Sequence, residues 1–212
     1  MKGAIWRSRT KGLTKKMNKY QIIALMGESG SGKDTVLNVN IKEHPDLFHK
    51  IITNTTRPMR DYEKDGVNYH FLSIEQFTRK VLNGEMLEAT EFNGWFYGSS
   101  VDALRRDKIN LGVFTPTGIE ALMENPDIDL SVIWVQADDK TRLLRCLNRE
   151  ENPDCVEICR RYFADLKDFE KAEDLLYAEL YNTEHTPLKH LDLCGLPYFS
   201  MVVKDMESRL GR

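Results

Sequence analysis

A glycine-rich segment follows a short apolar run near the N-terminus and offers the plainest chemistry in the sequence. Its residues are Gly27, Glu28, Ser29, Gly30, Ser31, Gly32, Lys33, Asp34 and Thr35. Glycines let backbone N–H groups converge on phosphate oxygens, and a helix that begins at the lysine adds a favourable dipole. Lys33 can then reach the β- and γ-phosphates, so we predict a P-loop that binds ATP, with Lys33 also catalytic.

The segment departs from the strict P-loop pattern, which has Ser or Thr directly after the lysine. Here Asp34 holds that position and Thr35 follows it. Because Mg²⁺ prefers oxygen ligands, we expect Asp34 or Thr35 near the Mg²⁺ ion that accompanies ATP, and we assign no other metal ligand. The five histidines and four cysteines show no metal-binding spacing, and we expect free thiols.

A second group of residues suits a phosphate dianion. Arg57 and Arg60 precede Tyr69 by about a dozen residues. Arginine forks grip phosphate oxygens in bidentate fashion, and a tyrosine hydroxyl adds a hydrogen bond without charge. Taken one by one, such arginines would more commonly be surface residues of a loop.

Two further segments, 84–88 (GEMLE) and 94–100 (GWFYGSS), follow in order. With these four ordered motifs the sequence resembles the guanylate kinase family, with specific motifs over residues 22–100 and more loosely over 111–169. The resemblance implies that Arg57, Arg60, Tyr69 and Tyr97 hold the acceptor phosphate, and that Thr53, Glu88 and Ser99 face the guanine. A carboxylate at Glu88 can accept hydrogen bonds from guanine N1–H and the 2-amino group.

The C-terminal half contains a charged helical pattern that resembles the lid of this family. The resemblance implies that Arg145, Arg149 and Arg161 cover the ATP and stabilise the transferring phosphoryl group, whereas Arg142 lies in the same region and receives no role. Phosphoryl transfer needs mostly positioning and charge neutralisation, which several cations supply. A solvated helix face with i,i+4 ion pairs is the rival interpretation for each arginine.

The family usually carries an acidic D-x-D-x-x-G strand end, but residues 113–118 read VFTPTG. With Gly118 as the anchor, Thr115 takes the position of the second aspartate, which is implicated in guanine contact. We therefore expect Thr115 to bind the substrate with relaxed base selection.

The elements that must position these residues alternate between strands and helices. Apolar runs at 21–26, 111–114 and 130–136 predict buried strands. Helices are expected at 33–42, at 73–83 behind a Ser73/Gln76 capping box, from 100 or 102 to 108, from Pro116, and as a pair within 138–174. Residues 197–206 fit either strand or helix. This order predicts an α/β P-loop NTPase fold, a parallel sheet flanked by helices, with an inserted NMP-binding lobe at about 53–100 and a helical lid at about 145–165.

The amino-acid composition excludes some classes of protein but does not by itself indicate a function. The chain has 212 residues with 30 basic and 33 acidic side chains, and no apolar run approaches the roughly 20 residues that cross a membrane. We expect one domain over 20–212, a disordered basic extension over 1–19, a cytoplasmic location, and neither a membrane nor a nucleic-acid partner.

The resemblance thus implies ATP-dependent phosphorylation of GMP or dGMP, with Mg²⁺ and by in-line transfer. Two alternatives stay open: a P-loop kinase for another nucleotide or a sugar phosphate, and a non-catalytic guanylate-kinase-like module that binds proteins. The intact loop through Lys33 argues against the second.

Overall fold

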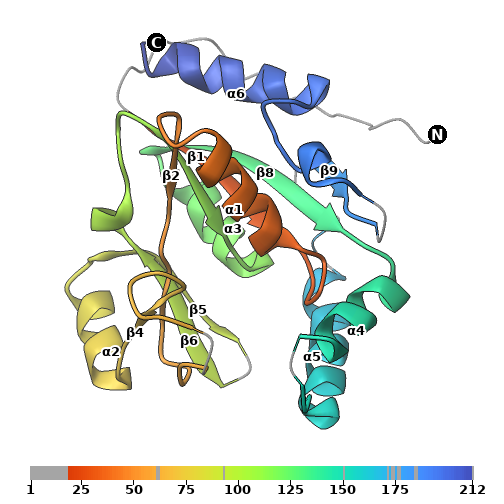
Figure 1. The fold of residues 1–212 in the computed structure, drawn as a ribbon. Coiled ribbons are helices and arrows are strands. Elements are labelled where there is room, and N and C mark those ends of the chain that lie inside the picture. Colours follow the sequence, from red (N-terminus) through yellow and green to blue (C-terminus); the bar gives the residue numbers. More distant parts are fainter. Residues whose placement is uncertain are drawn as a thin grey trace.

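Five parallel strands form the central sheet of the protein (Figure 1). The computed structural model describes residues 19–211 except 61–62, 93, 150, 171, 173–174, 176–177 and 184–185, so the predicted extension lies outside the described residues apart from Lys19. The strands run in the order β2 (Phe48–Lys50), β7 (Ile109–Val113), β1 (Tyr20–Met26), β8 (Ile128–Gln136) and β9 (Ala178–Tyr181). All four pairings are parallel, which confirms the predicted α/β sheet.

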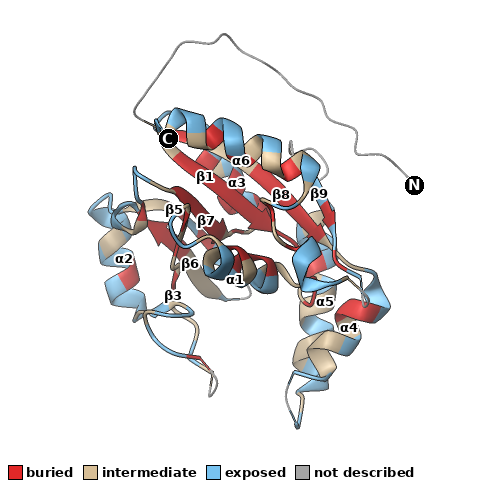
Figure 2. Cartoon of the chain, turned by 45° about the horizontal axis from the view of Figure 1, so that its top comes forward, coloured by how far each residue is buried: buried red, intermediate tan, exposed pale blue. Residues whose placement is uncertain are grey.

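Helices cover both faces of this sheet (Figure 2), and every residue of β1 after Tyr20 is therefore buried. Ile23 and Leu25 pack towards α1 (Lys33–Glu43) and α6 (Pro197–Arg209), in one apolar cluster. Ile22, Ala24 and Met26 pack towards α3 (Pro116–Glu124) on the other face. A strand buried on two sides reads as a continuous apolar run, as the sequence does here.

A second, four-stranded sheet is inserted between β2 and β7. Its order is β4 (His70–Phe71), β3 (Asn54–Thr55), β6 (Trp95–Ser100) and β5 (Met86–Phe92). Helix α2 (Ile74–Leu82) begins with the predicted capping box, in which Ser73 and Gln76 each bond the other's backbone. The helix ends before Gly84, whose φ of +68° favours glycine.

Two antiparallel helices follow β8 and stand apart from the sheet (Figure 1). They are α4 (Asp139–Leu147) and α5 (Cys155–Phe169), and each is N-capped by an aspartate that accepts a hydrogen bond from a first-turn N–H. The predicted pair of helices with a break near Pro153 is confirmed. At its C-terminal end α5 meets the core through Phe169, whose ring centroid lies 5.6 Å from that of Trp134.

The helix predicted to run from Ser100 or Asp102 to Lys108 is wrong. A single 3-10 turn spans Val101–Ala103, and the chain is extended at Leu104. The buried amide of Asn110 explains the difference, because its Oδ1 accepts from Arg105 N at 2.7 Å and its Nδ2 donates to Arg105 O at 2.8 Å. These backbone groups are therefore bonded to a side chain instead of to a further helical turn.

The C-terminal segment completes the fold. It contributes the edge strand β9, a 3-10 turn at Leu188–His190 and the helix α6, which resolves the ambiguity over residues 197–206 in favour of a helix. All four cysteines are free, as expected. In the part of the chain that the structure describes, no helix is long and apolar enough to span a bilayer.

Candidate active site

The glycine-rich segment forms the turn between β1 and α1, at the carboxyl end of the central strands. Gly30 and Gly32 adopt φ values of +82° and +92°, and a Cβ at either position would collide with Arg142 or with Asn182. Gly32 is the N-cap of α1 and provides no side-chain cap. The first N–H groups of the helix thus lack a capping side chain, which is the arrangement that accepts phosphate.

Lys33 folds back over this loop. Its Nζ donates to the carbonyl oxygen of Glu28 at 3.4 Å, and its side chain is partly buried. Asp34 and Thr35 are exposed in the first turn of α1. The charge of Asp34 contributes to the raised pKa of Tyr69 after the larger effect of burial, so this carboxylate lies near the residues of the inserted sheet.

Two buried charges from the helix pair hold the P-loop from outside. Arg142 in α4 donates to Ser29 O at 3.2 Å, and Asp165 in α5 accepts from Ser29 N at 2.6 Å. Their side chains are 3% and 4% exposed, and Nη2 of Arg142 lies 3.6 Å from Oδ2 of Asp165 as an ion pair. Sequence reasoning left Arg142 without a role and had no local signal for Asp165.

Arg145 is the one predicted lid arginine with a hydrogen bond to the P-loop in the described part of the chain. It donates to Gly30 O at 3.2 Å and to Ser31 O at 3.3 Å. Asn182, which follows β9 and which sequence reasoning missed, donates to the same Ser31 oxygen at 2.8 Å and accepts from Arg145 at 3.3 Å. The loop is therefore held from β9 as well as from α4.

The structure does not bring Arg149 and Arg161 to the P-loop. Arg149 is exposed just beyond the end of α4. Arg161 pairs with Glu157 at 2.8 Å across one helical turn of α5, and Arg160 pairs with the same carboxylate. The Arg161 contact is an i,i+4 helix pair, as in the rival interpretation of the charged segment, and the Arg160 contact is an i,i+3 pair.

Arg57 lies in a partly buried cluster at the inserted sheet. Its guanidinium is 2.7 Å from the carboxylate of Glu63 and faces the rings of Tyr69 and Phe71 at 5.4 and 5.7 Å. Burial alone would lower the pKa of Arg57, but the hydrogen bond and charge of Glu63 raise it. Tyr97 lies edge-on to Tyr69 with 6.2 Å between ring centroids.

Glu63 organises both arginines of this cluster, although no sequence motif drew attention to it. Its other oxygen accepts from the backbone N of Arg60 at 2.9 Å, and the Arg60 guanidinium lies 3.9 Å away. Burial would raise the pKa of Glu63, yet its bonds to Arg57 and Arg60 keep that pKa below its ordinary value. The carboxylate is thus ionised and fixes Arg57 beside Tyr69.

Glu88 is a buried carboxylate on β5, opposite Ser99 on β6. It is 7% exposed, and burial raises its pKa to about 7 against a smaller, opposite effect of Ser99. Its Oε2 lies close to Gly118, because a Cβ there would approach Oε2 to 3.2 Å. No arginine or lysine in the described residues forms a salt bridge with Glu88, so it can accept a ligand's donors.

Thr115 stands beside this carboxylate as the N-cap of α3. Its Oγ1 accepts from Gly118 N at 3.1 Å and lies 3.4 Å from the hydroxyl of Thr90. An aspartate can fill an N-cap equally well, which explains why threonine is tolerated here. Thr53 contributes only its carbonyl oxygen, which accepts from His70 N at 3.0 Å, so its predicted contact with guanine gains no support from the described contacts.

A separate cavity of ≈ 290 Å³ lies between the inserted sheet, α2 and the turn after β6. Its lining includes Asn54, His70, Lys80 and Asp102, and none of the predicted site residues. This cavity is therefore distinct from the candidate phosphate- and base-binding residues, which lie at the P-loop and around Arg57 and Glu88.

The parallel sheet, the P-loop at its carboxyl edge and the inserted sheet define a P-loop NTPase fold with a second phosphate-binding candidate. The family model described as "Guanylate kinase" matches residues 19–176. Since this is well over half of the 212 residues, the chain belongs to the guanylate kinase family.

Relatives and a solved structure agree with this assignment. A guanylate kinase of Helicobacter hepaticus is 42% identical over 99 residues, which cover 45% of this chain and 49% of that protein. A guanylate kinase of Synechococcus is 40% identical over 96 residues, 45% of this chain and 51% of that protein. The chain thus spans about half the length of the curated relatives that it matches. The crystal structure of guanylate kinase from Anaplasma phagocytophilum shares the fold, with a TM-score of 0.58 and 18% identity over 93% of this chain and 90% of that one.

Proposed function

We propose that this protein phosphorylates GMP, dGMP or both with ATP and Mg²⁺. The observation that carries the proposal is the buried carboxylate of Glu88, 7% exposed, beside the N-terminus of α3. A buried anion without a cationic partner is destabilising unless a ligand supplies donors. Guanine presents two donors, N1–H and the 2-amino group, on one edge, whereas the same edge of adenine presents none in that arrangement.

The acceptor phosphate binds at the Arg57 cluster. The guanidinium is held by Glu63 at 2.7 Å, so less side-chain entropy is lost when it grips a phosphate. Tyr69 and Tyr97 offer hydroxyl donors, and the raised pKa of Tyr69 keeps its hydroxyl protonated. Arg60 supplies a second cation, because its guanidinium lies 3.9 Å from the same Glu63 carboxylate. We assign the NMP-binding lobe to residues 53–100 on this basis.

The ATP phosphates bind at the N-terminus of α1. The P-loop backbone, Lys33 and Arg145 surround this end of the helix, and Arg145 is fixed by the carbonyl oxygens of Gly30 and Ser31. Lys33 turns from Glu28 O to the β- and γ-phosphates when nucleotide is present. In this proposal the lid comprises residues 145–165, and Arg149 and Arg161 act only after it moves towards the nucleotide.

Mg²⁺ would be held near Asp34 and Thr35, which are exposed oxygen donors in the first turn of α1. The donor chemistry fits, because Mg²⁺ takes hard oxygen ligands and keeps several waters. When bound, the ion neutralises charge on the β- and γ-phosphates. The attacking group is a phosphate oxygen of the acceptor, so the chain needs no general base and no covalent intermediate.

The test is release of ADP from ATP across GMP, dGMP, AMP, CMP, UMP and ribose 5-phosphate. We expect turnover with GMP or dGMP far above the others, and turnover lower by several orders of magnitude in Lys33→Ala. A preference for another acceptor would favour a different P-loop kinase. Absence of turnover with every acceptor, in protein that still binds GMP, would favour the non-catalytic module.

A further inference from the structure

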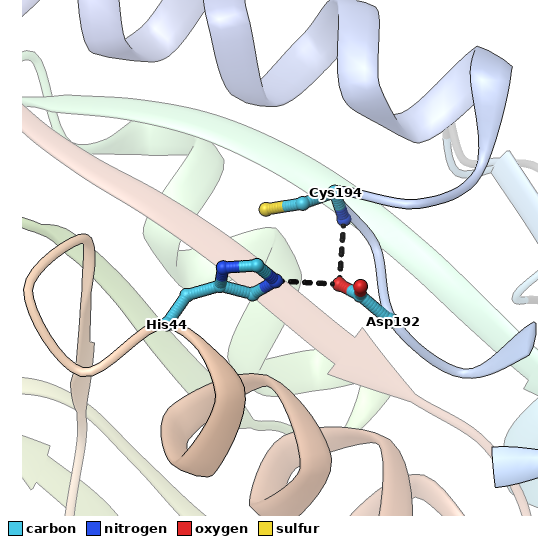
Figure 3. Close-up of side chains that lie close together, drawn as sticks. All are labelled: His44, Asp192 and Cys194. Atoms are coloured by element: carbon cyan, nitrogen blue, oxygen red, sulfur yellow. Dashed lines mark hydrogen bonds and ion pairs between the residues drawn. The ribbon is translucent and has the colours of Figure 1, made fainter. Parts of the chain in front are cut away.

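Three side chains with metal-binding atoms meet far from the nucleotide site, where the C-terminal segment packs on the end of α1 (Figure 3). His44 follows the last residue of α1, and Asp192 and Cys194 lie in the turn that precedes α6. One ring nitrogen, one carboxylate oxygen and the thiol sulfur all lie within 4.8 Å of one another.

A buried asparagine holds the two segments together. The Nδ2 of Asn40 in α1 donates to Leu191 O at 2.8 Å, and its Oδ1 accepts from Leu193 N at 2.9 Å. Leu191 and Leu193 are both buried in the apolar cluster under α6. The turn that carries Asp192 and Cys194 is thus docked on α1 by hydrogen bonds between the Asn40 side chain and the backbone of the turn, which fixes the positions of the three side chains.

The two carboxylate oxygens of Asp192 have different contacts. Oδ1 accepts from His44 Nε2 at 2.9 Å and from the backbone N of Cys194 at 3.0 Å. Within the described chain no donor bonds Oδ2, and no lysine or arginine pairs with this carboxylate. Figure 3 shows both hydrogen bonds ending on a single oxygen.

The surroundings of the thiol favour a cation. The Asp192 carboxylate accepts from the backbone N of Cys194 at 3.0 Å and offers an oxygen within 4.8 Å of the Cys194 sulfur, and no lysine or arginine of the described chain pairs with it. A carboxylate beside a thiol attracts a divalent ion, and the bound ion in turn stabilises the thiolate.

We propose that His44, Asp192 and Cys194 bind Zn²⁺. Thiolate, imidazole and carboxylate are its usual ligands, whereas Mg²⁺ and Ca²⁺ do not select a thiolate. Thiolate and carboxylate together neutralise the ion, the thiol proton leaves to solvent, and water completes a tetrahedral set. Zinc ligands sit about 2.0 to 2.3 Å from the metal and so roughly 3.5 Å apart, so the side chains must close by about 1 Å. His44 and Asp192, at 31% and 24% exposure, have room to do so.

Bound metal would join the end of the P-loop helix α1 to the turn that precedes α6. His44 and Asp192 are 148 positions apart in the sequence, so the ion would cross-link two distant segments. An ion that binds only the folded chain stabilises it by mass action. Zinc should therefore stabilise the whole domain and leave the nucleotide contacts in place.

The test titrates the full chain with Co²⁺, which reports a thiolate ligand through a charge-transfer band in the near ultraviolet. We expect one equivalent of Co²⁺ to give this band and one of Zn²⁺ to abolish it. The band should be lost in Cys194→Ser and strongly reduced in Asp192→Asn, yet kept in the matched control Cys159→Ser, whose thiol is exposed on α5. Excess Zn²⁺ should raise Tm by about 5 to 10 °C in wild type and control, but not in the two site variants.

Several results would overturn the proposal. They are a wild type with no band, a band that survives Cys194→Ser, and a band lost in Cys159→Ser. Asp192→Asn retains an oxygen acceptor for His44 and for Cys194 N, so we expect its metal-free Tm to stay near that of the wild type. If both site variants fold and their Zn²⁺-dependent Tm shift equals that of the wild type, the ion binds elsewhere.

Discussion

The buried carboxylate of Glu88 should make GMP binding depend on pH in the neutral range. Its pKa of about 7 compares with an ordinary value of 4.5, and burial is the main cause. In the proposed complex the guanine donors bond the ionised form, so affinity should fall as pH drops through 7. An ordinary glutamate would lose affinity in the same direction but only below about pH 5, because it stays ionised down to that pH.

The magnitude follows from the ionised fraction. With a pKa of about 7, roughly 90% of the Glu88 side chains are ionised at pH 8 and roughly 3% at pH 5.5. The Kd for GMP should therefore rise about 30-fold between these two pH values, equivalent to about 2 kcal/mol. The acceptor phosphate also titrates, with a pKa near 6, and this adds a second, independent loss at the Arg57 cluster.

The matched control is Glu88→Gln, which keeps the shape and removes the titration. Calorimetric titration with GMP at several pH values, with ATP absent, should show a steep dependence for wild type. The variant should bind GMP weakly at pH 8 and show only the shallower dependence of the phosphate. Equal pH slopes for the two proteins would refute the reasoning, because Glu88 would then play no part in binding the base.

The free protein offers an independent check on the same carboxyl group. The pKa of Glu88 is higher in the folded than in the unfolded protein, so the folded state binds the proton more tightly. The free energy of unfolding should therefore decrease as pH rises from about 4.5 to 7. Above pH 7 the ionised carboxylate lowers the free energy of unfolding by about 3 kcal/mol, which is the difference between the two pKa values converted to free energy. Glu88→Gln should therefore raise Tm at pH 8 by about 6 to 12 °C and raise it much less at pH 5. An unchanged Tm at pH 8 would mean that the carboxylate is better solvated than the structure indicates.

Three further variants test the rest of the site. Lys33→Ala should reduce turnover by several orders of magnitude with GMP affinity nearly intact, and turnover within about tenfold of wild type would reject a catalytic role. Arg57→Ala should weaken GMP binding by about tenfold to a hundredfold in calorimetry, and Glu63→Gln should weaken it less, because it loosens Arg57 without removing it. Thr115→Asp should raise the kcat/KM ratio of GMP over IMP by about tenfold or more, and an unmoved ratio would show that Thr115 does not reach the 2-amino group.

Local sequence signals sufficed wherever a short segment decides its own structure. Gly30 and Gly32 marked the turn that opens α1, because only glycine adopts those φ values beside such close neighbours. The Ser73 capping box and Pro116 marked the starts of two helices for similarly local reasons. The central sheet was predictable because its strands are buried on both faces and read as apolar runs.

Local signals failed where a distant residue decides the outcome. The expected helix after Ser100 gives way to the bonds of Asn110, and Asp165 reaches Ser29 across 136 positions of sequence. Among the lid arginines, the motif could not separate Arg145, which bonds the P-loop, from Arg161, which pairs within its own helix.

The sequence by itself determined the family, the α/β order of elements and the residue types that the site offers. Only the tertiary structure decided that Glu63 fixes Arg57, that Glu88 is buried beside Thr115, and that His44 meets Cys194. The physical reason is that residue type and spacing govern backbone geometry over a few residues. The pKa and the partners of a charged side chain depend instead on burial, which segments far apart in the sequence create together.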